Sequence, residues 1–148
     1  MSYDFDSMDM KKIFQPKIWY IICGAMALIG GIENNMNAES WAESAWGADG
    51  VNDQSLALEM VMGLFMMGFG VMSLITAFIL EGTVQAKFAI FNGGAMLAFF
   101  VILFVMLPTS GYANPGMMFL IPPLVLLGCL ITSGVMHKDE EATSAVAE

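Results

Sequence analysis

Four polar side chains near the ends of two long apolar segments have types that could do chemistry: Glu33, Asn34, Asn37 and Glu59. A carboxylate inside an apolar membrane segment is costly unless it is protonated, paired or hydrated. Amide side chains beside it supply both hydrogen-bond donors and acceptors. We therefore interpret Glu59 with Glu33, Asn34 or Asn37 as a proton or cation site. The alternative is that Glu59, one turn into its segment, is a helix-start carboxylate that the helix dipole and water stabilise.

No other set of residues predicts a reaction. The chain has one His, no Arg and two Cys, and it contains no Cys-x-x-Cys motif, no phosphate-binding glycine loop and no Ser at a definable spacing from a base. We expect no catalytic residue, no metal site and no resident cofactor, with quinone or lipid left open as ligands. These residues do not decide whether the protein is an enzyme, but the lack of a reaction centre favours a protein that is not one.

The composition indicates which elements must position these residues. The chain of 148 residues is 57% hydrophobic and 13% charged, with a mean hydropathy of +0.70. A water-soluble core of this size cannot bury that much apolar surface, so lipid must be part of the solvent. Four segments approach the length that a membrane-spanning helix needs: about 16–36, 56–80, 88–107 and 117–136. We predict an all-α, integral membrane four-helix bundle over residues 16–136, with acidic tails at 1–15 and 137–148.

The positive charges predict the orientation of this bundle. All five are lysines on one side of the predicted membrane: Lys11, Lys12, Lys17, Lys87 and Lys138. Lysine and arginine are enriched in the cytoplasmic loops of membrane proteins. We therefore expect both termini and the loop around Lys87 to be cytoplasmic, in a bacterial-type inner or plasma membrane. The net charge of −9 excludes the basic patch that binding to nucleic acid needs.

The loop between the first two segments predicts a short amphipathic helix over residues 38–46. Its alanines and tryptophans recur at helical spacing, while Glu and Ser take the other face. Asn37 is suited to the N-cap and Gly47 to the stop. We expect this helix to lie in the outer membrane interface, with a partner-docking surface as the alternative. The expected interfacial anchors of the chain are Trp19, Tyr20, Trp41 and Trp46.

The two central segments, joined by the short polar link 81–87, are expected to form a hairpin around which the bundle packs. Small residues four apart let a neighbouring helix approach closely, and a buried amide bonds across to it. The expected seam, and the tightest contact of the bundle, consists of Ala89, Asn92, Gly93, Gly94 and Ala98. In the fourth segment, the pair Pro122 and Pro123 predicts a kink or break in the helix, with a cavity-lining role as the alternative.

Two glycine-containing segments carry a resemblance to a known group. They are residues 63–70, Gly-Leu-Phe-Met-Met-Gly-Phe-Gly, and residues 91–94, Phe-Asn-Gly-Gly. With them, residues 17–136 resemble the small four-helix, DoxX-like group of membrane proteins at the level of pattern. The resemblance implies a middle hairpin built on these glycines and, as for some members, a link to quinone-coupled sulfur oxidation. This chain differs in having no Arg after its second segment and in its long outer loop with two tryptophans.

These observations favour a non-catalytic integral membrane subunit or scaffold that packs within a larger membrane assembly. Its expected partners are membrane lipids and either other integral membrane subunits or further copies of itself. One alternative is a small-molecule or quinone-linked redox accessory protein of the membrane. A small transporter is the third alternative, although the sequence shows neither an inverted repeat nor a charge at the membrane midplane.

Overall fold

The computed structural model describes residues 7–112 and 117–140, and every regular element within these ranges is helical. The elements are α1 (Ser7–Ile13), α2 (Pro16–Met36), α3 (Ala38–Trp46), η1 (Ala48–Gly50), α4 (Asp53–Ile79), α5 (Gly82–Met106), η2 (Leu107–Ser110) and α6 (Met117–His137). Helices α2, α4, α5 and α6 are long and apolar enough to cross a membrane. The predicted all-helical fold with four such helices is confirmed, and it favours an integral membrane protein.

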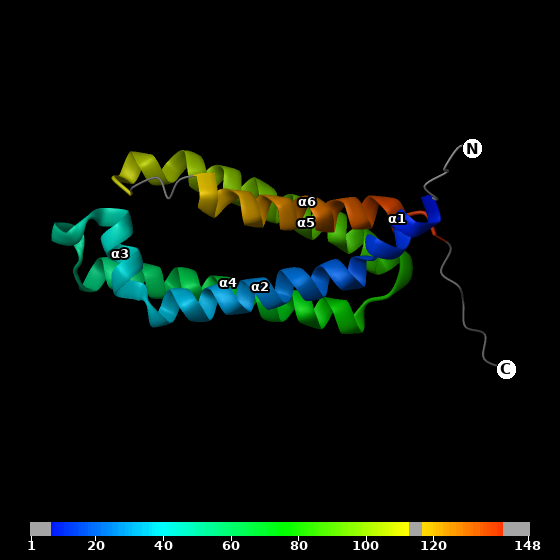
Figure 1. Ribbon diagram of the computed structural model, residues 1–148, viewed down its shortest axis with the longest axis horizontal. Helices are drawn as coiled ribbons and strands as arrows, with labels where there is room; N and C mark the ends of the chain where they lie inside the picture. The colour runs from blue at the N-terminus through cyan, green and yellow to red at the C-terminus, as the bar shows by residue number, and fades with distance from the viewer. Residues whose placement is uncertain (1–6, 113–116, 141–148) are drawn as a thin grey trace.

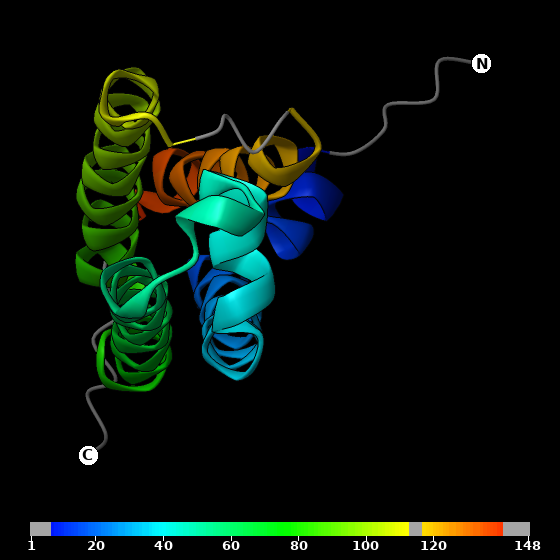
Figure 2. The same ribbon diagram turned by 90° about the vertical axis from the view of Figure 1, so that its left-hand side faces the viewer.

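The four long helices form two pairs that lie as two layers (Figure 1). Helix α2 packs along α4 in one layer, and α5 packs along α6 in the other. The layers meet mainly where α2 contacts α6. Seen from the end that carries α3, α5 lies above α4, and α6 passes above α2 (Figure 2). The backbones of α4 and α5 make little close contact, so the expected central hairpin is not the packing centre of the bundle.

Two glycine pairs bring the backbones of α2 and α4 into direct contact. A Cβ atom built at Gly24 would lie 2.9 Å from the carbonyl oxygen of Gly70, and one at Gly31 would lie 2.6 Å from that of Gly63. No side chain larger than hydrogen fits at these positions without moving a backbone. An equally close backbone contact joins α5 and α6 at Gly134, where a Cβ atom would lie 2.5 Å from the Ala86 carbonyl oxygen, beside Ala89 of the seam expected around Asn92.

The seam between α5 and α6 uses only part of the expected set. Ala89 is fully buried, and a Cβ atom at Gly93 would lie 2.7 Å from the Ile131 side chain of α6. Gly94 has no atom within 4 Å of the position a Cβ would take, and Ala98 is exposed. Successive helical residues point about 100° apart, so Gly93 and Gly94 cannot both face α6.

Polar residues at the ends of α4 explain two boundaries that hydropathy misplaces. At its start, Asn52 and Ser55 form a capping box, which moves the first turn three residues ahead of the predicted start at 56. At its end, the buried amide of Gln85 donates to the carbonyl oxygens of Thr76 and Ala77, at 3.2 Å each. These hydrogen bonds hold Gln85 inside the bundle, where it can be part of a helix. Helix α5 therefore begins at Gly82, and most of the predicted link 81–87 is helical.

Three further expectations change with the structure. Tyr20 is fully buried in a core cluster with Cys23 and Leu130, so it is not an interfacial anchor; Trp19, by contrast, is half-buried beside that cluster. The expected tail 1–15 contains helix α1. Pro122 and Pro123 lie inside α6, which continues through them without a break.

The α2 and α4 contact predicts opposite effects for two alanine substitutions on α4. Gly70→Ala should lower the free energy of unfolding in detergent micelles by about 1 to 3 kcal/mol, because the new methyl group collides with Gly24 and Leu28. Gly68→Ala is the matched control, since nothing lies within 4 Å of its Cβ position. It should be neutral or slightly stabilising. Equal effects of the two substitutions would contradict the close contact.

Candidate functional site

Glu59 is the one acidic side chain among the described residues that is buried deep in a long helix. It is 2% exposed and lies six residues beyond Asp53, about 9 Å along α4. The capping box of Asn52 and Ser55 fixes where α4 begins, and so fixes the direction in which Glu59 points. The interpretation of Glu59 as a water-exposed helix-start carboxylate is therefore wrong.

Two donors from different parts of the chain reach the carboxyl group of Glu59. Asn34 Nδ2, on α2, donates to Oε2 at 3.4 Å, and the Tyr112 hydroxyl, after η2, donates to Oε1 at 3.1 Å. The Tyr112 ring meets the Trp46 ring edge to face, with centroids 5.2 Å apart. The sequence suggests Tyr112 only as a member of the outer aromatic belt, because no local pattern tells which helix a loop residue will contact.

Burial, and then the nearby Glu59, raise the pKa of the Tyr112 hydroxyl well above its ordinary value. The hydroxyl therefore stays protonated at every physiological pH. It acts as a fixed hydrogen-bond donor to Glu59 and covers the carboxyl group from the α3 end of the bundle.

The other two residues of the expected site lie apart from Glu59. The exposed Glu33 carboxylate accepts hydrogen bonds from Asn37 Nδ2 and from Trp41 Nε1, each at 3.1 Å. Residues 33 and 37 share one face of α2, while Asn34 points about 100° away, toward α4. Helical phase thus divides the predicted cluster into a buried Asn34 and Glu59 pair and a surface tie between α2 and α3.

The predicted helix over residues 38–46 is present as α3, and it packs on the protein through alanines. Ala38, Ala42 and Ala45 are buried. Trp41 and Trp46 are half-buried, and both contact protein groups, Glu33 and Tyr112 respectively. Helix α3 therefore forms part of the cover over the Glu59 site.

A second polar region lies between the layers, closer to the chain termini. The buried hydroxyl groups of Tyr20 and Ser73 have no hydrogen-bond partner among the described residues. Asn92 lies beside the Tyr20 hydroxyl, but the two groups do not reach hydrogen-bond geometry. Cys23 and Cys129 are free thiols, and Cys23 Sγ donates weakly to the Leu126 carbonyl at 3.7 Å. This region contains no pair of groups arranged for proton transfer or nucleophilic attack.

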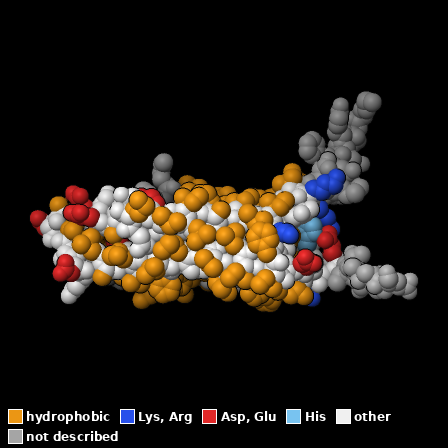
Figure 3. Space-filling view, turned by 90° about the horizontal axis from the view of Figure 1, so that it is seen from below, with side chains coloured by type: hydrophobic (Ala, Val, Ile, Leu, Met, Phe, Trp, Pro, Cys, Tyr) orange, Lys and Arg blue, Asp and Glu red, His pale blue; other side chains and the backbone are white. Residues whose placement is uncertain are grey.

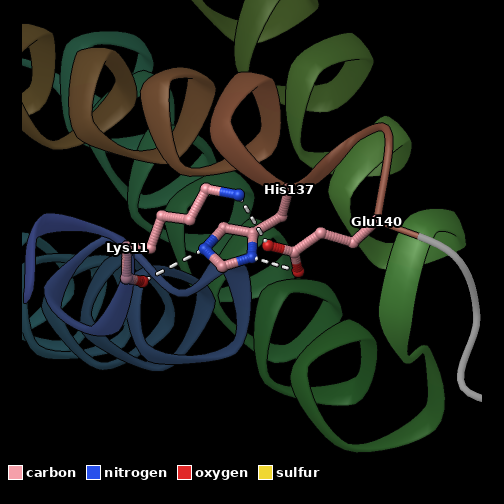
Figure 4. Close-up of polar contacts among 3 residues, drawn as sticks. All are labelled: Lys11, His137 and Glu140. Carbon is pink, nitrogen blue, oxygen red and sulfur yellow. Dashed lines mark hydrogen bonds and ion pairs between the residues drawn. The ribbon is translucent and has the colours of Figure 1, made fainter. Parts of the chain in front are cut away.

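A third polar cluster joins α1 to the end of α6 (Figure 4). Glu140 accepts from Lys11 Nζ at 3.0 Å and contacts His137 Nδ1 at 2.7 Å, while His137 Nε2 lies 3.1 Å from the Lys11 carbonyl oxygen. The two ring nitrogens of His137 thus connect the end of α6 both to Glu140 and to the backbone of α1. Hydrogen bonds from His137 and Lys11 hold the pKa of Glu140 below its ordinary value.

The surface of the described residues has two hollows that could hold a ligand. One of about 310 Å³ lies beside the Lys11 cluster and is lined by Gln15, Pro16, Lys17, Glu81, Gly82, Gln85, His137 and Glu140. The other, of about 230 Å³, lies between α5 and α6 and is lined by Phe100, Val101, Phe104, Val105, Leu120 and Leu124. The second offers only hydrocarbon, so a polar quinone headgroup would find no partner there.

Among the described residues, no group of three His, Cys, Asp or Glu side chains could hold a metal ion. Comparison with protein-family models, with curated proteins and with solved structures finds no match to this chain. The DoxX-like resemblance stays a prediction from sequence pattern. The site with the most defined geometry is the buried Glu59 with Asn34 and Tyr112.

The bond from Tyr112 to Glu59 predicts a measurable loss when its hydroxyl is removed. Tyr112→Phe keeps the ring against Trp46 and should lower the free energy of unfolding by about 1 kcal/mol, with faster hydrogen exchange in residues 107–112. Tyr20→Phe is the control, because it removes a buried hydroxyl that has no partner among the described residues. It should leave stability unchanged or raised. If Tyr112→Phe behaved like Tyr20→Phe, the hydrogen bond would not be contributing.

The His137 and Glu140 contacts predict that docking of α1 depends on pH. A carboxyl group whose folded-state pKa is lowered stabilises the structure above its ordinary value, here 4.5, and loses that effect as the pH falls through the folded-state pKa. The protection factors of the α1 amides, which correct for the pH dependence of intrinsic exchange, should therefore fall in acid, and Glu140→Gln should remove this step. Asp139→Asn, one residue earlier, should leave the acid step in place. An unchanged step in Glu140→Gln would contradict the assignment.

Proposed function

We propose that this protein is a non-catalytic integral membrane subunit whose α5 helix packs against a transmembrane helix of another subunit. The observation that carries the proposal is the distribution of burial along α5. Of its 25 residues, only Gln85, Ala86, Ala89 and Gly93 are buried, and all four lie in the half nearer the chain termini. No residue in the other half of α5 is buried among the described parts of the chain.

Two small residues in this half of α5, Gly94 and Ala98, form a surface on which another helix could pack closely. Gly94 has nothing near its Cβ position, and Ala98, one turn further on, is exposed. Pairs of small residues four apart allow helix backbones to approach closely within a membrane. The chain uses such contacts between α2 and α4, but it leaves the Gly94 and Ala98 pair without a partner helix among the described residues.

The surface is consistent with a membrane subunit of defined orientation. Hydrophobic side chains cover the length of the bundle in Figure 3. Acidic side chains lie at the α3 end of this face, and lysines lie with a histidine and further acidic side chains at the other end. We place the lysine-bearing end, with both termini, in the cytoplasm of a bacterial-type cell. On this placement α3 lies at the outer interface, with its Glu and Ser face toward water.

Purification from native membranes in a mild detergent, followed by cross-linking, tests the proposal. The wild-type chain should migrate in a complex, and partner recovery should fall about tenfold when Gly94→Leu and Ala98→Leu are combined, because the added bulk fills the contact. The monomer should keep its helical content, since nothing lies within 4 Å of the Cβ position of Gly94 and Ala98 is exposed.

Gly68→Leu provides the matched control for bulk on a lipid-facing surface. Gly68 is an exposed glycine of α4 with nothing within 4 Å of its Cβ position. This variant should keep wild-type partner recovery. A wild-type chain that migrates only as a monomer would contradict the proposal. Complexes that contain only copies of this chain would mean that α5 packs against a second copy rather than against another subunit.

A further inference from the structure

We propose that Glu59 is a proton-binding site that exchanges its proton with the aqueous phase at the α3 end of the bundle. The first observation is the absence of a compensating charge. All five lysines lie at the opposite end, and the one nearest along α2, Lys17, is 17 residues from Asn34, which is about 26 Å of helix. An ionised Glu59, 2% exposed, would be a buried charge without a cation.

Both hydrogen-bond donors to Glu59 are neutral groups. Asn34 donates to Oε2 at 3.4 Å and Tyr112 donates to Oε1 at 3.1 Å. Neither donor supplies the positive charge that would compensate an ionised carboxylate at this buried position.

A buried oxygen atom beside Glu59 could accept a hydrogen bond from its protonated carboxyl group. Asn34 is 8% exposed, and its Oδ1 has no partner among the described residues. A half-turn of the amide exchanges Oδ1 with Nδ2, the atom that now faces Glu59 Oε2. In the protonated state, Glu59 carries H⁺ on Oε2, and this hydroxyl group donates to Asn34 Oδ1. After the proton is released to water, the amide turns back and the carboxylate again accepts from Asn34 Nδ2. Tyr112 donates to Oε1 in both states.

A proton suits this arrangement better than a metal ion. A bound metal needs several oxygens turned toward it, whereas Asn34 Nδ2 and the Tyr112 hydroxyl present hydrogens to the carboxyl group. Tyr112, from the loop after α5, touches Glu59 and is half-buried, so the proton enters beside its ring. The charged groups on the neighbouring elements at this end are Glu33 of α2, Glu39 and Glu43 of α3, Asp49 of η1 and Asp53 of α4.

Infrared difference spectroscopy of the full chain in detergent micelles tests the assignment during a pH titration. We expect a carboxylic acid C=O band that disappears with rising pH and is missing in Glu59→Gln, a variant that keeps the size and polarity of the side chain. Glu33→Gln removes an exposed carboxylate at the same end and should leave the band intact. Tyr112→Phe removes one hydrogen bond to the Glu59 carboxyl group, so the band should change in frequency but stay present.

The outcomes separate the proposal from its rivals. A titrating band that survives in Glu59→Gln would overturn it, and so would a spectrum in which no buried carboxylic acid band appears at any pH. A midpoint that moves with sodium concentration at constant ionic strength would replace the proton with a metal cation. The assay reads the monomer, so its result does not depend on the partner helix proposed for α5.

Discussion

The contact between α2 and α4 is made by backbone atoms across two glycine pairs, and the rest of the structure depends on it. Helices in lipid gain little from burying apolar side chains, so they associate through close backbone approach and a few polar bonds. Gly24 with Gly70 and Gly31 with Gly63 set both the distance and the register of these antiparallel helices. Asn34 follows Gly31 by three residues and Glu59 precedes Gly63 by four, so the same register places the amide opposite the carboxyl group.

The interior of this bundle has the composition that lipid solvent favours. The largest fully buried side chains are Tyr20, Leu130, Glu59, Ser73 and Ser133, so three of the five are clearly polar. Large apolar side chains, by contrast, lie mainly on the outer surface, where lipid tails can cover them. Polar groups inside such a bundle are costly unless they are bonded, so a carboxyl group held there by two donors is a feature that the fold must specifically accommodate.

The predicted segments 16–36 and 117–136 match the bounds of α2 and, to within one residue, those of α6. The length that a spanning helix needs, with Pro16 at the first helical position, gave the bounds of α2. Hydropathy misplaced the starts of α4 and α5, where the capping box at Asn52 and the inward-facing Gln85 make polar residues part of the helix. The pairing of Asn34 with Glu59 was among the predicted combinations. The sequence alone could have shown that Glu33 does not join this pair, because residues 33 and 34 of a helix point about 100° apart. The contact with Tyr112 could not have been predicted, because it joins residues 53 positions apart through packing that no local pattern encodes.

The pairing of the helices also bears on how the protein enters a membrane. Each layer is built from two consecutive spans, α2 with α4 and α5 with α6, so each can form from a contiguous stretch of the nascent chain. The first layer can therefore close its glycine contact before α5 has been synthesised, and the second can follow as a unit. Biogenesis then amounts to the docking of two preformed halves, with the Tyr112 hydroxyl reaching Glu59 only in the last step.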